Sequence, residues 1–270
     1  MLNKKVFILT WCNSLDKLYG SLLVFNTLRV GFPTADVFVI DNCSIESAVP
    51  YIESAAVNVN AKFFSLRNEV NHYDHIRNII FSCDENDKIF IIDPDVIFWD
   101  NVEIFDTEKA IAGRLIPEFF DEYTNTITKA RIHTSFLYLS NVKRIKDCII
   151  NTKKKYFESD LIRPVMVKDG KKWLRWDTVG QLYENIVDDC EIFDDVMNDK
   201  FDHIFCGSHL DIIVDKWNFD KLVEIHELAK RNQRLLKGIW REQNEFFISK
   251  GLKNEENQDG EEGRQGNVRV

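Results

Sequence analysis

The chain has 270 residues, 44% of them hydrophobic, which is enough to bury a sizeable core in one large or two small domains. Its formal net charge is −9 at pH 7, and the acids are spread along the chain. This distribution argues against a nucleic acid as the main partner, because such proteins carry a basic stripe. No apolar run approaches the roughly 18 residues of a membrane span.

The six cysteines show no C-x-x-C spacing, so a structural zinc site is not expected. The first residues contain two lysines followed by a short apolar run and do not have the pattern of a signal peptide. We therefore expect a cytoplasmic protein whose thiols are free.

Apolar runs rich in strand-forming residues alternate with helical patterns in the first hundred residues. The expected strands are 5–10, 36–41, 57–66 and 88–93, and the expected helices are 15–30, 45–56 and 75–83. Strands without polar interruptions are typical of a parallel sheet that is covered on both faces. The pattern predicts an α/β fold with a Rossmann-like, mostly parallel sheet and helices on both faces.

The second half is less regular. We expect strands at 110–115, 133–140 and 201–206, and helices from about 142, at 177–185 and at 219–250. The α/β domain then spans residues 1–215, in two parts, 1–100 and 101–215. Residues 216–252 form a C-terminal helical extension, and residues 253–270 lack the apolar content to pack and are expected to be disordered.

Polar residues follow three of the expected strands, at Thr10-Trp11, Asp41 and Asp93-Pro94-Asp95. Open parallel sheets bind their ligands at the carboxyl ends of the strands. Two carboxylates one residue apart at the end of a buried strand repel each other unless a cation compensates them, and hard divalent cations prefer such oxygens. The alternative is a pair of solvated turn aspartates, which is common for a bare D-x-D triplet.

The segment Ile89–Phe98 resembles the D-x-D block of the GT-A superfamily of glycosyltransferases, in which four apolar residues precede the acids. Further similar segments follow in the expected order between about residues 5 and 215. The resemblance implies an enzyme that moves a sugar from a nucleoside-diphosphate sugar, with UDP-sugars favoured, to a hydroxyl of a glycan or another acceptor. It also implies Mn²⁺ or Mg²⁺ as the cofactor, a nucleotide-sugar half at 1–100 and an acceptor half at 101–215.

The resemblance also assigns roles to individual residues. It places Asp93 and Asp95 on the metal, with His209 slightly preferred over His203 as a third ligand. The H-x-x-G-x-x-K-P-W motif of the glycogenin-like family 8 is absent from this region, which leaves the subfamily open. The nucleotide-sugar contacts implied by the resemblance are Thr10, Trp11, Asp41, His75, Arg77 and Asp93.

Asp177, in the segment Trp176–Gly180, resembles the acid that meets the acceptor, where an inverting transferase needs a general base. The alternative for Asp177 is an N-cap of the helix that follows. Arg77 and Arg114 are candidate contacts to the diphosphate or the sugar, and surface ion pairs are an equally good explanation for each.

Two other functions remain open at this point. A haloacid-dehalogenase-like phosphohydrolase also has D-x-D after an apolar strand, but here two strands precede the motif and Ile97 occupies the position of its usual Thr or Val. A non-catalytic protein of the same fold would bind a nucleotide or glycan without turnover. The basic residues of the C-terminal helix allow weak contact with an anionic membrane surface, although packing on the domain is the simpler explanation.

Overall fold

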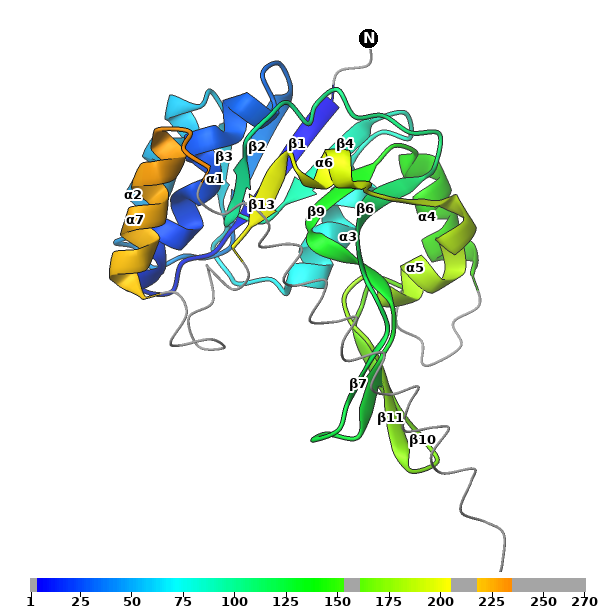
Figure 1. Ribbon diagram of the computed structural model, residues 1–270. Coiled ribbons are helices and arrows are strands. Elements are labelled where there is room, and N and C mark those ends of the chain that lie inside the picture. The colour runs from blue at the N-terminus through cyan, green and yellow to red at the C-terminus, as the bar shows by residue number, and fades with distance from the viewer. Residues whose placement is uncertain (1–3, 153–160, 205–217, 235–270) are drawn as a thin grey trace, which may run out of the picture.

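The computed structural model describes residues 4–152, 161–204 and 218–234, and its centre is a seven-stranded sheet (Figure 1). The strand order is β12-β6-β9-β4-β1-β2-β3. The strands are β1 (Lys4–Thr10), β2 (Asp36–Asp41), β3 (Lys62–Ser65), β4 (Lys88–Ile92), β6 (Ile111–Ile116), β9 (Arg131–Leu139) and β12 (Cys190–Ile192). All neighbouring pairs are parallel except those of β9, which runs antiparallel to β4 and β6. The prediction of a mostly parallel sheet is confirmed.

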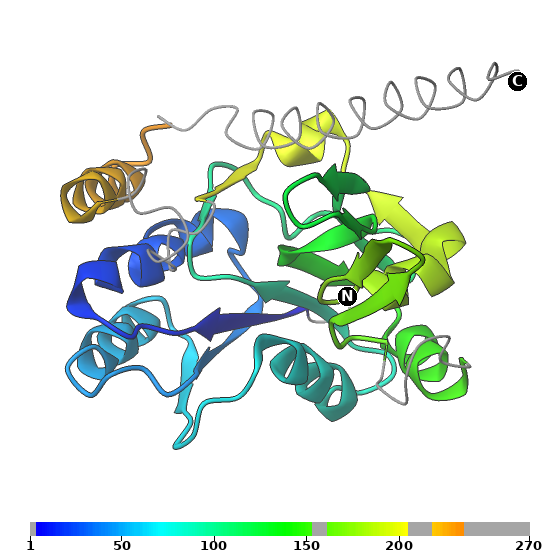
Figure 2. The same cartoon turned by 90° about the horizontal axis from the view of Figure 1, so that it is seen from below.

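Helices cover both faces of this sheet (Figure 2). They are α1 (Leu18–Gly31), α2 (Val49–Asn58), α3 (His72–Ser82), α4 (Val142–Asn151), α5 (Gly180–Ile186), α6 (Asp195–Asn198) and α7 (Phe219–Lys230), and 3-10 turns lie at Leu15–Lys17 and Val187–Asp189. Alternate residues of β1 enter opposite cores: Val6 and Ile8 pack with α1 and α2, whereas Phe7 and Leu9 pack with α3, α4 and α5. In the described part of the chain, no helix is long and apolar enough to cross a membrane.

Several boundaries differ from the sequence-based expectations because local signals shift them. A 3-10 turn precedes α1, and α2 starts at Val49, with Pro50 in its first turn. Because α2 continues to Asn58, the strand expected over 57–66 is confined to β3. Helix α5 starts at Gly180, after the expected start at Asp177.

The helix expected over 219–250 is the largest correction. Helix α7 ends at Lys230, and Asn232 has a left-handed φ of 50°, which an Asn tolerates at a helix terminus. Its apolar side, with Leu222 and Ile225, packs on α1 through Leu23. Arg234 lies 3.7 Å from Asp199 rather than in solvent. The rest of the expected extension and the tail fall outside the described residues.

A second, four-stranded sheet, which we call the arm, projects from the body (Figure 1). Its strands, in the order β10-β11-β8-β7, are β7 (Phe119–Asp121), β8 (Thr126–Thr128), β10 (Val165–Asp169) and β11 (Lys172–Trp176). The sequence analysis did not predict it, because its strands are short and rich in charged residues. Two local hairpins, β7 with β8 and β10 with β11, are joined by the distant pairing of β8 with β11, and Lys129 N donates to Arg175 O at 2.8 Å.

The remaining two strands form a short antiparallel ribbon of their own. They are β5 (Val96–Phe98) and β13 (Phe201–His203), and the register places His203 opposite Val96. The ribbon therefore brings a residue from late in the chain next to Asp95, and Ile204 N donates to Asp95 O at 2.9 Å.

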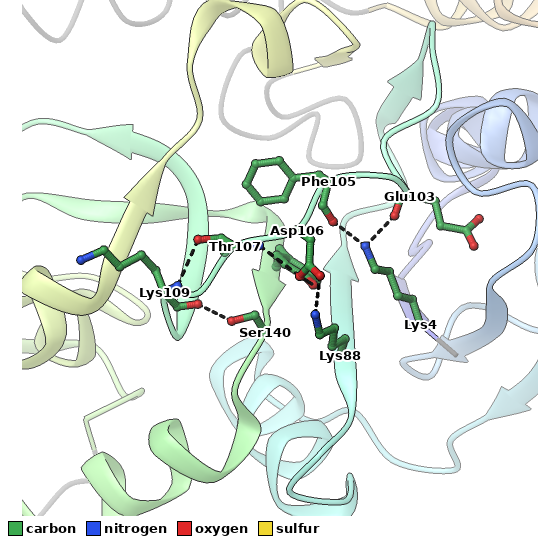
Figure 3. A network of polar contacts seen from close by, with 9 residues as sticks. Lys4, Lys88, Glu103, Phe105, Asp106, Thr107, Lys109 and Ser140 are labelled. Atoms are coloured by element: carbon green, nitrogen blue, oxygen red, sulfur yellow. Dashed lines mark hydrogen bonds and ion pairs between the residues drawn. The ribbon is translucent and has the colours of Figure 1, made fainter. Parts of the chain in front are cut away.

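A polar cluster closes the edge of the sheet where β1 and β4 begin (Figure 3). Lys4 Nζ donates to the backbone oxygens of Glu103, at 2.6 Å, and Phe105, in the loop that leads to β6. Lys88 pairs with Asp106, which also accepts from Tyr138 Oη at 2.7 Å. Burial acts to raise the pKa of Asp106, but the bonds from Lys88 and Tyr138 lower it overall. These bonds hold the loop at the edge where the amino ends of β1 and β4 lie.

Gly31, the last residue of α1, supports β5 from behind. An added Cβ would lie 2.5 Å from Cγ of the fully buried Phe98, while the Gly31 oxygen accepts bonds from Val102 N and Glu103 N. We predict that Gly31→Ala lowers the free energy of unfolding by about 1–3 kcal/mol, because a tightly packed core resists an extra methyl group. Urea unfolding measures this difference. Asn78→Ala, at an exposed position of α3, is the control and should change stability by no more than about 0.5 kcal/mol. A Gly31→Ala protein as stable as the parent would contradict the packing described for β5.

Candidate active site

A cavity of about 500 Å³ opens where the central strands β1 and β4 end. Such an edge is where open α/β sheets bind their ligands. The expected site residues that line it are Thr10, Trp11, His75, Asp93, Asp95, Asp177 and His203. Lining residues that were not among the expected ones include Asn42, His72, Arg131 and His133.

Asp93, Asp95 and His203 form a cluster in this cavity. Each offers one ligand atom, and the three atoms lie within 4.8 Å of one another. His203 Nε2 is 3.2 Å from Asp95 Oδ1. Both residues are buried, and Asp93 is half-buried. The sequence analysis preferred His209 to His203 as the third ligand; His209 lies outside the described residues, and His203 is the histidine that the ribbon brings to the two acids.

The backbone of the Asp93–Asp95 turn is bonded on three sides. Asp93 N donates to Ser135 O of β9 at 2.9 Å, and Val24 N of α1 donates to Pro94 O at 2.9 Å. Ile204 N, just after β13, provides the third bond, to Asp95 O. Because strand, helix and ribbon each fix one residue of the turn, the two carboxylates are held close together despite their repulsion.

The electrostatics of the cluster favour a cation. Burial, and then the neighbouring Asp95 carboxylate, raise the pKa of Asp93 well above its ordinary range, while His203 acts in the opposite direction. A group shifted in this way is disfavoured as an anion unless positive charge lies nearby. Two carboxylate oxygens and one imidazole nitrogen suit Mn²⁺, and the oxygens suit Mg²⁺. The residues present therefore fit the divalent cation that the sequence resemblance implies.

Asp41 and Asn42, at the end of β2, have different surroundings. Asp41 is fully buried and accepts bonds from the hydroxyls of Thr10, Ser44 and Ser65. Asn42 lines the cavity and exchanges two 2.8 Å bonds with the Val70 backbone. Asp41 thus organises the strand ends and is not among the lining residues, whereas Asn42 fixes the loop before α3 at the rim.

The start of α3 contributes imidazoles rather than cations. His75 lines the cavity, and its Nε2 forms no hydrogen bond within the part of the chain that the structure describes. Burial lowers the pKa of His72 to about 4 and also lowers the pKa of His75, so both are neutral at pH 7. Arg77 is not among the lining residues, and its guanidinium lies over the Phe81 ring at 5.0 Å.

Arg131 and Asp177 form an ion pair of 2.8 Å on the wall of the cavity. Burial acts to raise the pKa of Asp177, but Arg131 and the Thr178 N–H lower it overall. Its side chain bonds Thr178 N and does not cap α5, whose N-cap is Val179. Asp177 is therefore an ionised acceptor of hydrogen bonds, and its low pKa makes it a weaker general base than an unpaired carboxylate.

His133, in β9, lies beside the cluster, with its ring centroid 5.0 Å from that of His203. Ser135 N donates to His133 Nδ1 at 3.0 Å, so Nδ1 is the acceptor and Nε2 carries the proton of the neutral ring. Burial, and then His203, hold the pKa of His133 well below its ordinary value. The signal in the sequence was a histidine near the polar start of a strand whose second half, Phe136–Leu139, is apolar.

Arg114, which the sequence offered as a candidate contact to the diphosphate or the sugar, does not line the cavity. Its guanidinium donates to Asn198 Oδ1 at 2.7 Å and to Phe201 O at 2.9 Å, and it lies 3.8 Å from the centroid of the Phe201 ring. Burial lowers its pKa to about 9. Arg114 thereby holds β13 in place and helps to fix the position of His203, which lies on the same strand.

No protein-family model matches the sequence, and no curated protein matches it. Solved structures with a similar fold include the glycosyltransferase GlyE of Streptococcus pneumoniae TIGR4, with a TM-score of 0.42 and 9% identity over 73% of this chain and 47% of that one. A mannosyltransferase from Pyrobaculum calidifontis, solved with GDP-Man and Mn²⁺, gives a TM-score of 0.44 and 9% identity over 86% and 70%.

The galactosyltransferase LgtC, solved with donor and acceptor sugar analogues, gives a TM-score of 0.45 and 9% identity over 83% of this chain and 95% of that one. The chain spans about half the length of GlyE and of the bifunctional WbbM, of which 47% and 52% are covered. These likenesses concern the fold alone.

The raised pKa of Asp93 predicts how the metal-free protein responds to pH. Because the native state binds this proton more tightly than the unfolded chain, stability falls as the pH rises above the unfolded carboxyl pKa of about 4. Asp93→Asn removes this loss, so at pH 7.5 in EDTA its melting temperature should exceed that of the parent by about 2 °C or more. The difference should shrink toward pH 4. A melting temperature below that of the parent at pH 7.5 would show that Asp93 is stabilised in the native state by other groups.

Proposed function

We propose that this protein is a metal-dependent glycosyltransferase that moves a sugar from a nucleoside-diphosphate sugar to a hydroxyl of an acceptor. The observation that carries the proposal is the Asp93–Asp95–His203 cluster in a cavity at the carboxyl edge of a parallel sheet. A diphosphate could not approach two carboxylates without a cation between them, because like charges repel strongly in a site shielded from water. Mn²⁺ or Mg²⁺ held by these side chains supplies the charge that stabilises the leaving diphosphate.

The lining residues divide the cavity into two ends. Thr10, Trp11 and Asn42 come from β1 and β2, where the sequence resemblance places the nucleotide. Arg131 and Asp177 come from the start of β9 and the segment after β11, on the side where it places the acceptor. The cluster lies at the end of β4, between these strands, as a diphosphate that joins nucleoside and sugar requires.

Neutral histidines beside the cluster suit contacts with the sugar, which would lie between the nucleotide end and the acceptor end of the cavity. His133 presents a protonated Nε2 beside the cluster, which serves as an uncharged donor to a sugar or phosphate oxygen. Asp177, ionised and fixed by Arg131, accepts the hydrogen bond of the attacking hydroxyl and orients it. The proposal assigns UDP-sugars as the first donors to test.

Asp95→Asn tests the chemistry. Asn keeps the shape of the side chain but removes the charge that the cation needs, so sugar transfer or donor hydrolysis with saturating Mn²⁺ should fall on the order of a thousandfold. The metal-free melting temperature should not fall, since one of two close carboxylates is neutralised. Asp100→Asn, at an exposed acid, is the matched control and should retain full turnover. A destabilised Asp95→Asn protein that still turns over donor would refute the assignment.

Nucleotide binding tests the metal bridge separately from turnover. Isothermal titration should give a Kd for UDP or GDP at least about tenfold lower in Mn²⁺ than in EDTA, since the cation screens the carboxylates from the diphosphate. A non-catalytic binding protein would pass this test and show no transfer. Equal affinity in Mn²⁺ and in EDTA would exclude a metal-bridged diphosphate.

A further inference from the structure

The arm begins at the wall of the cavity. Arg131 follows the strand β8 and Asp177 follows the strand β11, and their 2.8 Å ion pair joins the two roots of the arm. Arg175, on β11, lies 3.8 Å from the same Asp177 carboxylate. A molecule whose reacting end lies beside Asp177 in the cavity therefore meets the arm where it leaves the cavity.

The hairpin of β10 and β11 is basic in an acidic protein. Residues 163–175 contain five basic side chains and one acid, whereas the whole chain has a net charge of −9. The basic residues are Arg163, Lys168, Lys171, Lys172 and Arg175. None of the three lysines forms an ion pair with a described residue. Such a local concentration of positive charge attracts anions.

One face of the hairpin combines these charges with an exposed aromatic ring. Lys168 lies opposite Trp173, and Met166 lies opposite Arg175, so the four side chains share a face. The Trp173 side chain is 37% exposed, with Lys168 Nζ 6.0 Å from its ring centroid. An indole flanked by cations offers a flat apolar surface and charge at the same place, as required by a ligand that has both apolar faces and anionic groups.

The arm lacks the covering that stabilises the main sheet. Only the root of the arm is covered: Trp176, the last residue of β11, is buried and donates to Glu184 of α5 at 2.7 Å. No residue of the four strands belongs to a described core cluster, and on the other face Ile127, Leu174 and Phe120 are only half-buried. A small sheet without a packed face contributes little stability by itself. The part of the arm beyond its root therefore adds little to the stability of the domain, which favours a role in binding.

We infer that the arm binds an anionic polysaccharide, the acceptor of the reaction, along the face formed by Met166, Lys168, Trp173 and Arg175. The inference rests on the proposed function, in which the hydroxyl of the acceptor lies beside Asp177 and the rest of the polysaccharide extends out of the cavity. The sugar rings pack on Trp173, and their carboxylates or phosphates pair with Lys168 and Arg175 of this face and with Lys171 of the turn. The turn Asp169–Lys172 has no apolar residue to enter a lipid layer, which favours a polymer in solution over a membrane.

Binding of a galacturonate oligomer, a polysaccharide with one carboxylate per sugar, tests the inference. Microscale thermophoresis of the full chain should show binding that weakens as salt rises, and a neutral malto-oligosaccharide of equal length should not bind. Trp173→Ala, and the double change of Lys168 and Lys171 to Ala, should each raise the Kd at least about tenfold. The matched control is the double change of Lys143 and Lys221 to Ala on α4 and α7, which removes the same charge and should leave the Kd unchanged.

Further variants and ligands separate this outcome from a folding defect and from other partners. Changing Lys168 and Lys171 to Arg instead keeps the charge and should retain binding. Equally tight binding of polyphosphate, single-stranded DNA or anionic phosphatidylglycerol vesicles would overturn the assignment to a glycan. So would the absence of galacturonate binding, or binding that the arm variants do not weaken.

The two proposals fail separately. Binding of UDP with Mn²⁺ reports on the cavity and should be the same in all arm variants, because none of the substituted side chains touches the cluster. Loss of metal-dependent UDP binding with intact galacturonate binding would reject the proposed function, and the reverse result would reject the role of the arm.

Discussion

The cavity depends on one constraint: two carboxylates, Asp93 and Asp95, are held within a few ångströms of each other beside a buried imidazole. Their repulsion disfavours the ionised pair in the metal-free protein, as the raised pKa of Asp93 indicates. The fold offsets this cost through the backbone bonds from β9, α1 and the segment after β13 to the three residues of the turn. A site that opposes its own charge in this way is suited to bind a divalent cation.

Contacts outside the cavity help to hold the three side chains of the cluster together. The ribbon of β5 and β13 carries His203, Gly31 leaves room for the Phe98 side chain of this ribbon, and Arg114 bonds both Phe201 O and Asn198. On the opposite edge, Lys4 and Lys88 hold the loop between β5 and β6. The side chains of the cluster come from two distant parts of the sequence, and their positions therefore depend on contacts made outside the cavity.

The sequence predicted the parts of the fold that local patterns determine. The strands β1, β2 and β4 are apolar runs. Because such sheets bind ligands at the carboxyl ends of their strands, the polar residues that follow these runs could be recognised as candidate site residues. The antiparallel direction of β9, the three-residue strand β13 and the joining of the two hairpins of the arm depend on pairing between distant segments, which periodicity does not contain. Asp41 shows the related problem for single residues, since burial by Thr10, Ser44 and Ser65 decided its place.

Pulsed electron paramagnetic resonance of bound Mn²⁺ tests the central claim most directly, because the electron spin of the metal couples to nuclei of its own ligands. The account predicts a nitrogen coupling from one imidazole in the parent protein, its loss in His203→Gln, and phosphorus couplings when UDP is added. A manganese signal without a nitrogen coupling, or one that His203→Gln leaves unchanged, would contradict the assignment of Asp93, Asp95 and His203 as the metal site.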